Sequence, residues 1–172
     1  VNLNRHAGIN PHISSMNDNH LFQPNPLLLK IPAPEKILII FNPISSAGNT
    51  ESLAHQMAAA LSQQGKHAEI CPSEKKMKGY TRIVDNIAAS DLVVVVGGDG
   101  TIRKLLDPLN KTTTPVYAIP GGNESLFARS YAMSTAADDL LQAIASGVCL
   151  QQFYGLISGK GICGEKPFFH MA

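Results

Sequence analysis

The feature that most constrains the fold is an apolar run that leads directly into a glycine-rich turn. Residues 91–101 read Asp-Leu-Val-Val-Val-Val-Gly-Gly-Asp-Gly-Thr. Consecutive valines between polar residues have the length and β-branching of a strand buried on both faces, as in a parallel sheet. Glycines after such a strand let the backbone approach a ligand closely or adopt positive φ. The segment therefore predicts a buried parallel strand followed by a ligand-binding turn.

The turn has the properties of a phosphate site. Thr101 can cap a helix that begins at Ile102, and the first amides of that helix suit an anion such as phosphate. A dinucleotide fingerprint from Gly98 would need a third glycine where Arg103 stands, and the Gly-Lys-Ser/Thr of a Walker loop does not follow. Two readings remain: a phosphate-binding turn with Asp99 in its middle, or a tight turn without a ligand.

Strands and helices alternate along most of the chain. The helix from Ile102 is expected to end before Pro108, because proline disfavours the helix interior. The other expected elements are strands at residues 36–41, 67–71, 91–96 and 116–119 and helices at residues 51–64, 79–89 and 138–147. This order predicts an α/β fold, an open and mostly parallel sheet with helices on both faces. The turns at Asn42, Gly97 and Gly122 would then gather at the carboxyl edge, where such sheets bind ligands.

The Gly-Gly-Asp-Gly-Thr turn resembles the signature of the diacylglycerol kinase catalytic domain family. That family includes bacterial lipid kinases and sphingosine kinases, and its superfamily includes NAD kinases and phosphofructokinases. Its first strand ends in Asn-Pro-x-Ser-Gly, and in this chain Asn42, Pro43 and Ser45 match, with Ser46 in place of the glycine. The resemblance covers about residues 36–172, with three motifs in the family's order.

The third motif follows the strand at residues 116–119. The family carries Pro-x-Gly-Thr-x-Asn-x-x-Ala-Arg there, with Glu among the residues seen between Thr and Asn. Asn123 stands for the Thr, Ser125 stands for the Asn, and Glu124 is the variant form. The residues that match are Pro120, Gly122, Ala128 and Arg129. Both substitutes keep polar side chains that can cap a helix or contact phosphate.

The resemblance implies ATP and Mg²⁺ as cofactors and a lipid hydroxyl as the phosphoryl acceptor. It implies that Ser73, just past the second strand, touches the nucleotide; the alternative is an ordinary turn serine. The other implied nucleotide-binding residues are Asn42, Pro43, Ser45, Gly97, Gly98, Asp99, Gly100, Thr101, Gly122, Asn123 and Glu124. Backbone amides and a hydroxyl would hold the phosphates, because phosphoryl transfer rests on positioning and on neutralising charge.

Asp99 is the expected catalytic residue. The resemblance assigns it to the Mg²⁺ and water network or to activation of the acceptor hydroxyl, and the alternative is a carboxylate that caps local amides. Lys104 stands where the family usually places Glu, three residues beyond the motif's Thr. With Ser46, Asn123 and Ser125, this departure keeps a second class open: a nucleotide-binding homologue without kinase activity. A soluble kinase similar to NAD kinases is a third alternative.

Composition narrows the class further. With 172 residues the chain has room for one substantial domain, and its formal net charge of +1 gives no electrostatic footprint for nucleic acid. Three cysteines without ligand spacing favour a reduced, cytoplasmic location. No apolar run approaches the length of a membrane span. Membrane contact is therefore expected to be peripheral, and a homodimer stays open.

We expect three parts in the chain. Residues 1–34, rich in Asn, His, Pro and Ser without any period, are predicted to be a disordered leader. Residues 35–147 are the expected α/β ATP-binding domain. Residues 148–172 are expected to supply strands that lead into a β-rich second domain, most of it missing from this sequence. On this view the fragment alone phosphorylates no lipid at an appreciable rate.

Overall fold

A four-stranded parallel sheet forms the centre of the protein. The computed structural model describes residues 2–5, 27–45, 48–73, 80–157 and 166–168. The strands are β3 (Lys36–Phe41), β4 (His67–Pro72), β5 (Leu92–Gly97) and β6 (Val116–Pro120), in the order β4-β3-β5-β6, and every neighbouring pair is parallel. The predicted fold class is confirmed. β5 occupies a central position, as its run of valines predicts.

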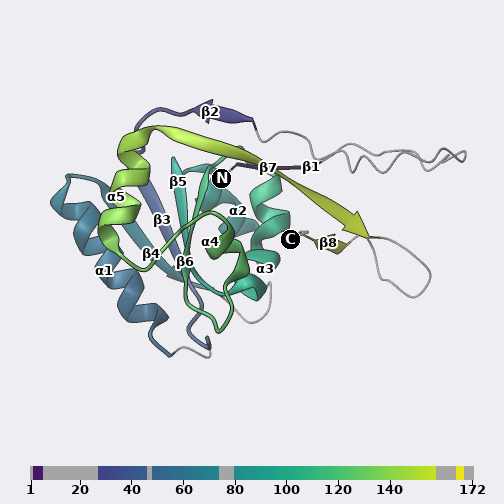
Figure 1. Cartoon of the computed structure of the whole chain (residues 1–172), viewed down its shortest axis with the longest axis horizontal. Coiled ribbons are helices and arrows are strands. Elements are labelled where there is room, and N and C mark those ends of the chain that lie inside the picture. Colours follow the sequence, from purple (N-terminus) through teal and green to yellow (C-terminus); the bar gives the residue numbers. More distant parts are fainter. Residues whose placement is uncertain (1, 6–26, 46–47, 74–79, 158–165, 169–172) are drawn as a thin grey trace, which may run out of the picture.

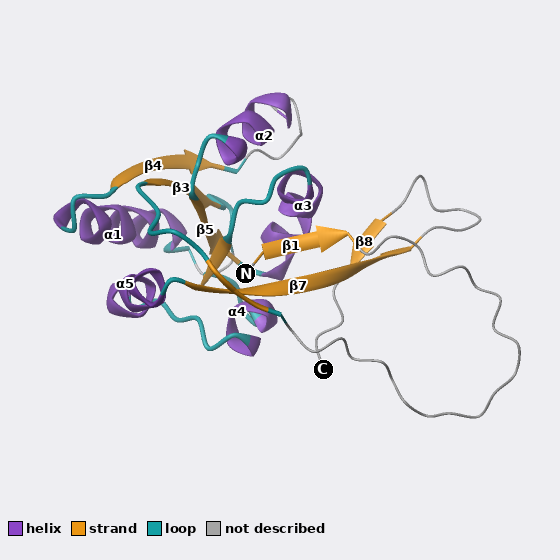
Figure 2. Ribbon diagram, turned by 90° about the horizontal axis from the view of Figure 1, so that it is seen from above, coloured by secondary structure: helices purple, strands orange, loops and turns teal. Residues whose placement is uncertain are grey.

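Helices cover both faces of this sheet. The helices are α1 (Thr50–Gln63), α2 (Tyr80–Ala88), α3 (Asp99–Asn110), α4 (Leu126–Ser130) and α5 (Ala137–Ser146). Figure 2 shows α1 and α5 on one side of the sheet and α2 and α3 on the other. The strands alternate between the two layers: Ile39 and Val94 pack in the core beneath α1, and Ile40 and Val95 pack in the core beneath α3. All four side chains are fully buried, which explains why these strands are apolar throughout.

A second sheet extends from the end of α5. Its long strand β7 (Val148–Ile157) pairs in parallel with β1 (Asn2–Arg5) and antiparallel with β2 (Leu28–Lys30) and β8 (Lys166–Phe168). β7 lies within residues 148–172, for which strands were expected (Figure 1). Two segments of the expected disordered leader are strands instead. Backbone pairing accounts for β2, since Gln151 N donates to Leu27 O (2.9 Å) at its start. Residues 6–26 and 169–172 lie outside the described residues.

Helix α3 differs from its prediction at both ends. It begins at Asp99 rather than Ile102, because Gly98 is extended (φ −95°, ψ −177°) and its carbonyl accepts the N–H groups of Thr101 (2.9 Å) and Ile102 (3.3 Å). Thr101 is therefore inside the first turn and not its cap. The helix also continues through Pro108 to Asn110. Pro108 is buried, so packing of the last turn offsets the missing backbone donor.

Candidate functional site

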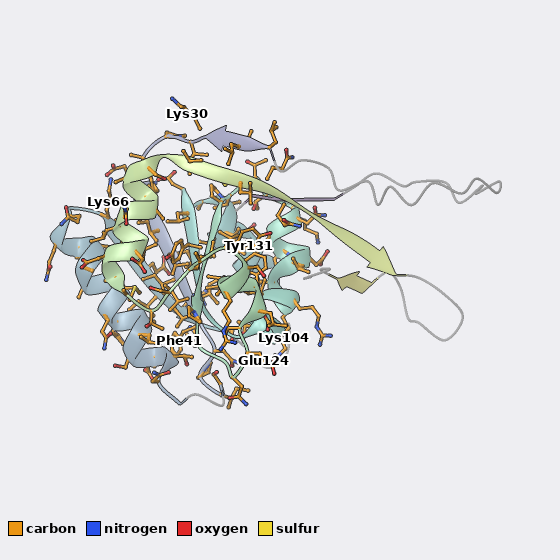
Figure 3. All side chains as sticks on the ribbon, viewed as in Figure 1. Lys30, Phe41, Lys66, Lys104, Glu124 and Tyr131 are labelled. Atoms are coloured by element: carbon orange, nitrogen blue, oxygen red, sulfur yellow. The ribbon has the colours of Figure 1, made fainter. Side chains whose placement is uncertain are left out.

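The three motif turns meet at the carboxyl edge of the sheet. Asn42 N donates to Val96 O (3.1 Å), and Gly121 N donates to Gly97 O (3.0 Å), so the turns after β3 and β6 both join β5. The Ser45 hydroxyl donates to Gly121 O and connects the first turn to the third. Figure 3 shows Phe41, Glu124 and Lys104 toward this end of the molecule and Lys66 toward the other. The predicted convergence of the turns is therefore present.

Close backbone packing accounts for most of the glycines. A Cβ at Gly122 would lie 2.8 Å from Gly98 Cα, and one at Gly98 would lie 3.2 Å from Gly122 Cα. A Cβ at Gly121 would lie 2.7 Å from Thr50 Cγ2 and 3.1 Å from Gly97 N. A Cβ at Gly97 would lie 2.6 Å from the Thr101 hydroxyl oxygen. The protein's own turns thus require glycine at these positions, whether or not a ligand binds.

Gly100 is different. It is exposed in the first turn of α3, and a Cβ there would meet nothing within 4 Å. Glycine in a helix costs about 0.5–1 kcal/mol relative to alanine, so nothing within the described structure explains it. Among the described residues, none accepts a hydrogen bond from the N–H of Asp99 or Gly100. Helix α3 therefore presents two free amides beside an open position, an arrangement that fits a phosphate group.

The Asp99 carboxylate caps a neighbouring helix. Its Oδ2 accepts the N–H of Leu126 (3.0 Å), and its Oδ1 accepts the N–H of Phe127 (2.9 Å). These are the first two residues of α4. The structure therefore contains the capping arrangement that was the alternative to a catalytic role for Asp99.

The first turn and the end of β4 also reach this edge. Asn42 Oδ1 accepts the N–H of Ile44 (3.3 Å), and Pro43 is exposed. Ser73 N donates to Phe41 O (2.7 Å), which places Ser73 beside the end of β3. Ser46 lies outside the described residues.

The side chains of the second and third turns differ in accessibility. Thr101 is only 4 % exposed and packs against Gly97, whereas Asn123, Glu124 and Lys104 are exposed. Sequence reasoning missed α4 and the left-handed backbone at Ser125 (φ 50°, ψ 47°) that precedes it. The family pattern carries Asn at this position, and Asn tolerates the left-handed conformation better than Ser does. That Asn was the feature from which the left-handed backbone could have been predicted.

The donor chemistry of this edge suits a cation carried by a nucleotide. Mg²⁺ is usually bound by one or two carboxylates together with substrate phosphates. Asp99 and Glu124 supply carboxylates on two of the turns. Within the described ranges, no group of three or more His, Cys, Asp or Glu is placed to hold a metal ion on its own. Nor does any helix there have the length and apolar character to cross a membrane.

A cavity of about 640 Å³ lies elsewhere, between the ends of α1 and α5. Lys66, Leu141 and Ile144 are among its lining residues, and it contains no motif residue. The carboxyl edge is the stronger candidate, because it combines free helix amides with the three motif turns.

Comparison with known proteins agrees with this geometry. The diacylglycerol kinase catalytic domain model matches residues 36–152. The chain belongs to this family. A diacylglycerol kinase from Mycobacterium tuberculosis (strain ATCC 25618 / H37Rv) is 29% identical over 101 residues, which are 58% of this chain and 33% of that protein. A relative from strain CDC 1551 / Oshkosh matches to the same extent. The chain thus spans about a third of the length of these curated relatives.

Solved structures share the fold. A diacylglycerol kinase from Bacillus anthracis str. Sterne has a TM-score of 0.54 and 21% identity, over 67% of this chain and 41% of that one. A second structure from that organism has a TM-score of 0.56, also at 21% identity, over 67% of this chain and 39% of its own. At this identity the likeness shows the fold alone.

Proposed function

We propose that this protein is an ATP-dependent lipid kinase that transfers a phosphoryl group from ATP to a lipid hydroxyl. The observation that carries the proposal is the pair of free amides at Asp99 and Gly100, located where the three family turns meet. Family membership over residues 36–152 supplies the reaction class. Bound Mg²⁺ would neutralise phosphate charge, and the exposed Glu124 of the third turn would be a carboxylate available to hold it.

The chain's own groups bind and orient the nucleotide. The phosphates lie on the amides of Asp99 and Gly100, because the Thr101 hydroxyl is buried against Gly97. Asn123 contributes a polar side chain from the third turn. The site is bordered by four residues at the ends of β3 and β4: Asn42, Pro43, Ser45 and Ser73. The acceptor is a lipid hydroxyl presented at a membrane surface that the protein contacts peripherally.

Transfer of radiolabelled γ-phosphate tests the acceptor. The chain would be incubated with Mg·ATP and mixed micelles containing diacylglycerol, sphingosine or phosphatidylglycerol, with NAD as a soluble acceptor in a parallel reaction. Label in a lipid supports the proposal, and label in NAD alone would replace it with the soluble-kinase alternative. ATP binding without label in any acceptor would fit either a non-catalytic homologue, for which Lys104 gives a specific reason, or the expectation that residues 1–172 alone phosphorylate no lipid.

Lys104 is exposed on α3, one turn beyond the free amides, at a position where the family pattern has an acid. An inactive protein would have two explanations: the Lys104 side chain prevents transfer, or the protein only binds nucleotide. The variant Lys104→Glu restores the acid and separates these two explanations. A gain of transfer would trace the loss to this side chain. No gain, with ATP affinity unchanged, would favour a nucleotide-binding function.

Calorimetric titration with Mg·ATP tests the assigned phosphate position through Gly100→Leu. A Leu side chain there meets no protein atom near its Cβ, so the fold should be at least as stable as wild type. ATP affinity should fall at least about tenfold, which is about 1.4 kcal/mol. Ser62→Leu is the matched control, because it adds a similar side chain at an exposed position on α1 and should leave affinity unchanged. Equal affinities for Gly100→Leu and wild type would place the nucleotide elsewhere.

A further inference from the structure

Asp99 connects two turns that are distant in sequence. The two amides that it accepts, those of Leu126 and Phe127, lie 27 and 28 residues further along the chain. They open α4, so neither has an acceptor within its own helix. A carboxylate from the start of α3 therefore satisfies the free donors at the start of α4.

Helix α4 does not cap itself. Its preceding residue, Ser125, makes no side-chain cap hydrogen bond. The Ser125 hydroxyl instead accepts the N–H of Gly122 (3.1 Å) and donates to Gly122 O (3.3 Å). With Ser125 only 3 % exposed and engaged within its own turn, Asp99 takes over the capping role.

The remaining support of α4 comes from its apolar face. Phe127 is buried in the same cluster as Ile102 of α3, and the centroid of its ring lies 5.0 Å from the ring centroid of Tyr131. Leu126 by contrast is 42 % exposed. A helix of five residues has little stability of its own, so its orientation depends on these contacts and on Asp99.

We infer that Asp99 is a positioning residue: its carboxylate holds α4, and with it residues 122–124, at a set distance from the free amides of α3. The two turns then form opposite walls of the phosphate site, so the inference rests on the proposed function. Aspartate suits this role electrostatically, because its negative charge faces the N-terminus of α4 and is compensated there. This role replaces the one expected from the sequence, in which Asp99 serves Mg²⁺ or activates the acceptor.

A graded series of variants separates the two roles. Asp99→Asn removes the charge but keeps one side-chain oxygen acceptor and is a good capping residue, whereas Asp99→Ala removes both acceptors. Asp107→Ala is the control, since Asp107 is exposed on the same helix and bonds neither α4 amide. Two readouts are measured on each protein: residue-resolved exchange of the Leu126 and Phe127 amides, and the affinity for Mg·ATP.

A positioning role predicts the same order in both readouts. Amide exchange should quicken roughly tenfold or more in Asp99→Ala, with Asp99→Asn intermediate and Asp107→Ala like wild type. ATP affinity should fall at least about tenfold in Asp99→Ala and only about threefold in Asp99→Asn. The Asn variant keeps the inference testable if the Ala variant fails to fold.

Two results would overturn the inference. One is equal exchange of the two amides in all the proteins, because no cap would then exist. The other is a loss of ATP affinity in Asp99→Asn as complete as in Asp99→Ala while its amides stay protected, because the charge itself would then act on the cation. A wild type that binds no ATP would refute the proposed function separately, and graded amide exchange would still support the link between α3 and α4.

Discussion

Asp91 and Asp99 flank the same buried strand, β5, and each accepts hydrogen bonds from two consecutive backbone amides. Asp91 precedes the strand at the amino edge and binds the N–H groups of Glu35 (2.9 Å) and Lys36 (2.8 Å) through one oxygen. Asp99 follows the strand at the carboxyl edge and uses one oxygen for each amide of α4. The same interaction, an aspartate that accepts two consecutive backbone amides, thus occurs at both edges of the sheet.

The surroundings of the two aspartates differ. At the amino edge, the bonds from Lys36 and Glu35 lower the pKa of Asp91, and Glu35 also pairs with Lys66 (2.8 Å). At the carboxyl edge, the first turn of α3 retains two amides without an acceptor among the described residues. At the amino edge, Asp91 therefore satisfies the amides that it faces. At the carboxyl edge, Asp99 holds α4 in place beside the α3 amides that have no acceptor among the described residues.

The largest expected effect concerns the packing at the carboxyl edge. Gly122→Ala should lower the free energy of unfolding by about 2–3 kcal/mol, because the new Cβ would lie 2.8 Å from the backbone of Gly98. Gly100→Ala at the same edge has free space and should be neutral or stabilising. Urea unfolding followed by circular dichroism measures both. Similar values for the two variants would mean that the turns are not in close contact.

At the amino edge, Asp91→Ala should lower the free energy of unfolding by about 1 kcal/mol at pH 7 and leave ATP affinity unchanged. The bonds that the folded state makes to Asp91 lower its pKa, so its contribution is complete above the unfolded-state pKa and is lost as the pH falls through the folded-state pKa. The difference between wild type and Asp91→Ala should therefore shrink below about pH 4. Urea unfolding at several pH values checks this expectation. A difference that persists to pH 2 would show that the charge of Asp91 does not matter.

The smallest expected effect compares two helix ends. Gly65 after α1 and Ala132 after α4 both have positive φ, +72° and 52°, and each helix closes with the same pair of backbone bonds. Only glycine adopts this conformation without strain. Ala132→Gly should raise the free energy of unfolding by about 0.5–1 kcal/mol, and Gly65→Ala should lower it by a similar amount. Thermal unfolding of both variants would show shifts of opposite sign, and equal signs would contradict this account.

Much of the fold follows from local sequence patterns. The apolar runs of β3 and β5 predict strands buried on both faces, and Gly65 and Gly147 mark the ends of α1 and α5. Both signals act over a few residues: burial of every side chain in a strand, and the low cost of positive φ for glycine. The sequence alone therefore predicts that the three turns lie at one edge of the sheet.

The sequence by itself determined the parallel sheet, its helices other than α4 and the family motifs, because periodicity and turn residues encode these features locally. Only the tertiary structure decided that Gly98 and Gly122 exclude each other's side chains and that Asp99 caps α4. Each of these depends on groups that meet across more than twenty residues of chain. Short-range propensity carries no information about such contacts, since they exist only after the sheet has brought the turns together.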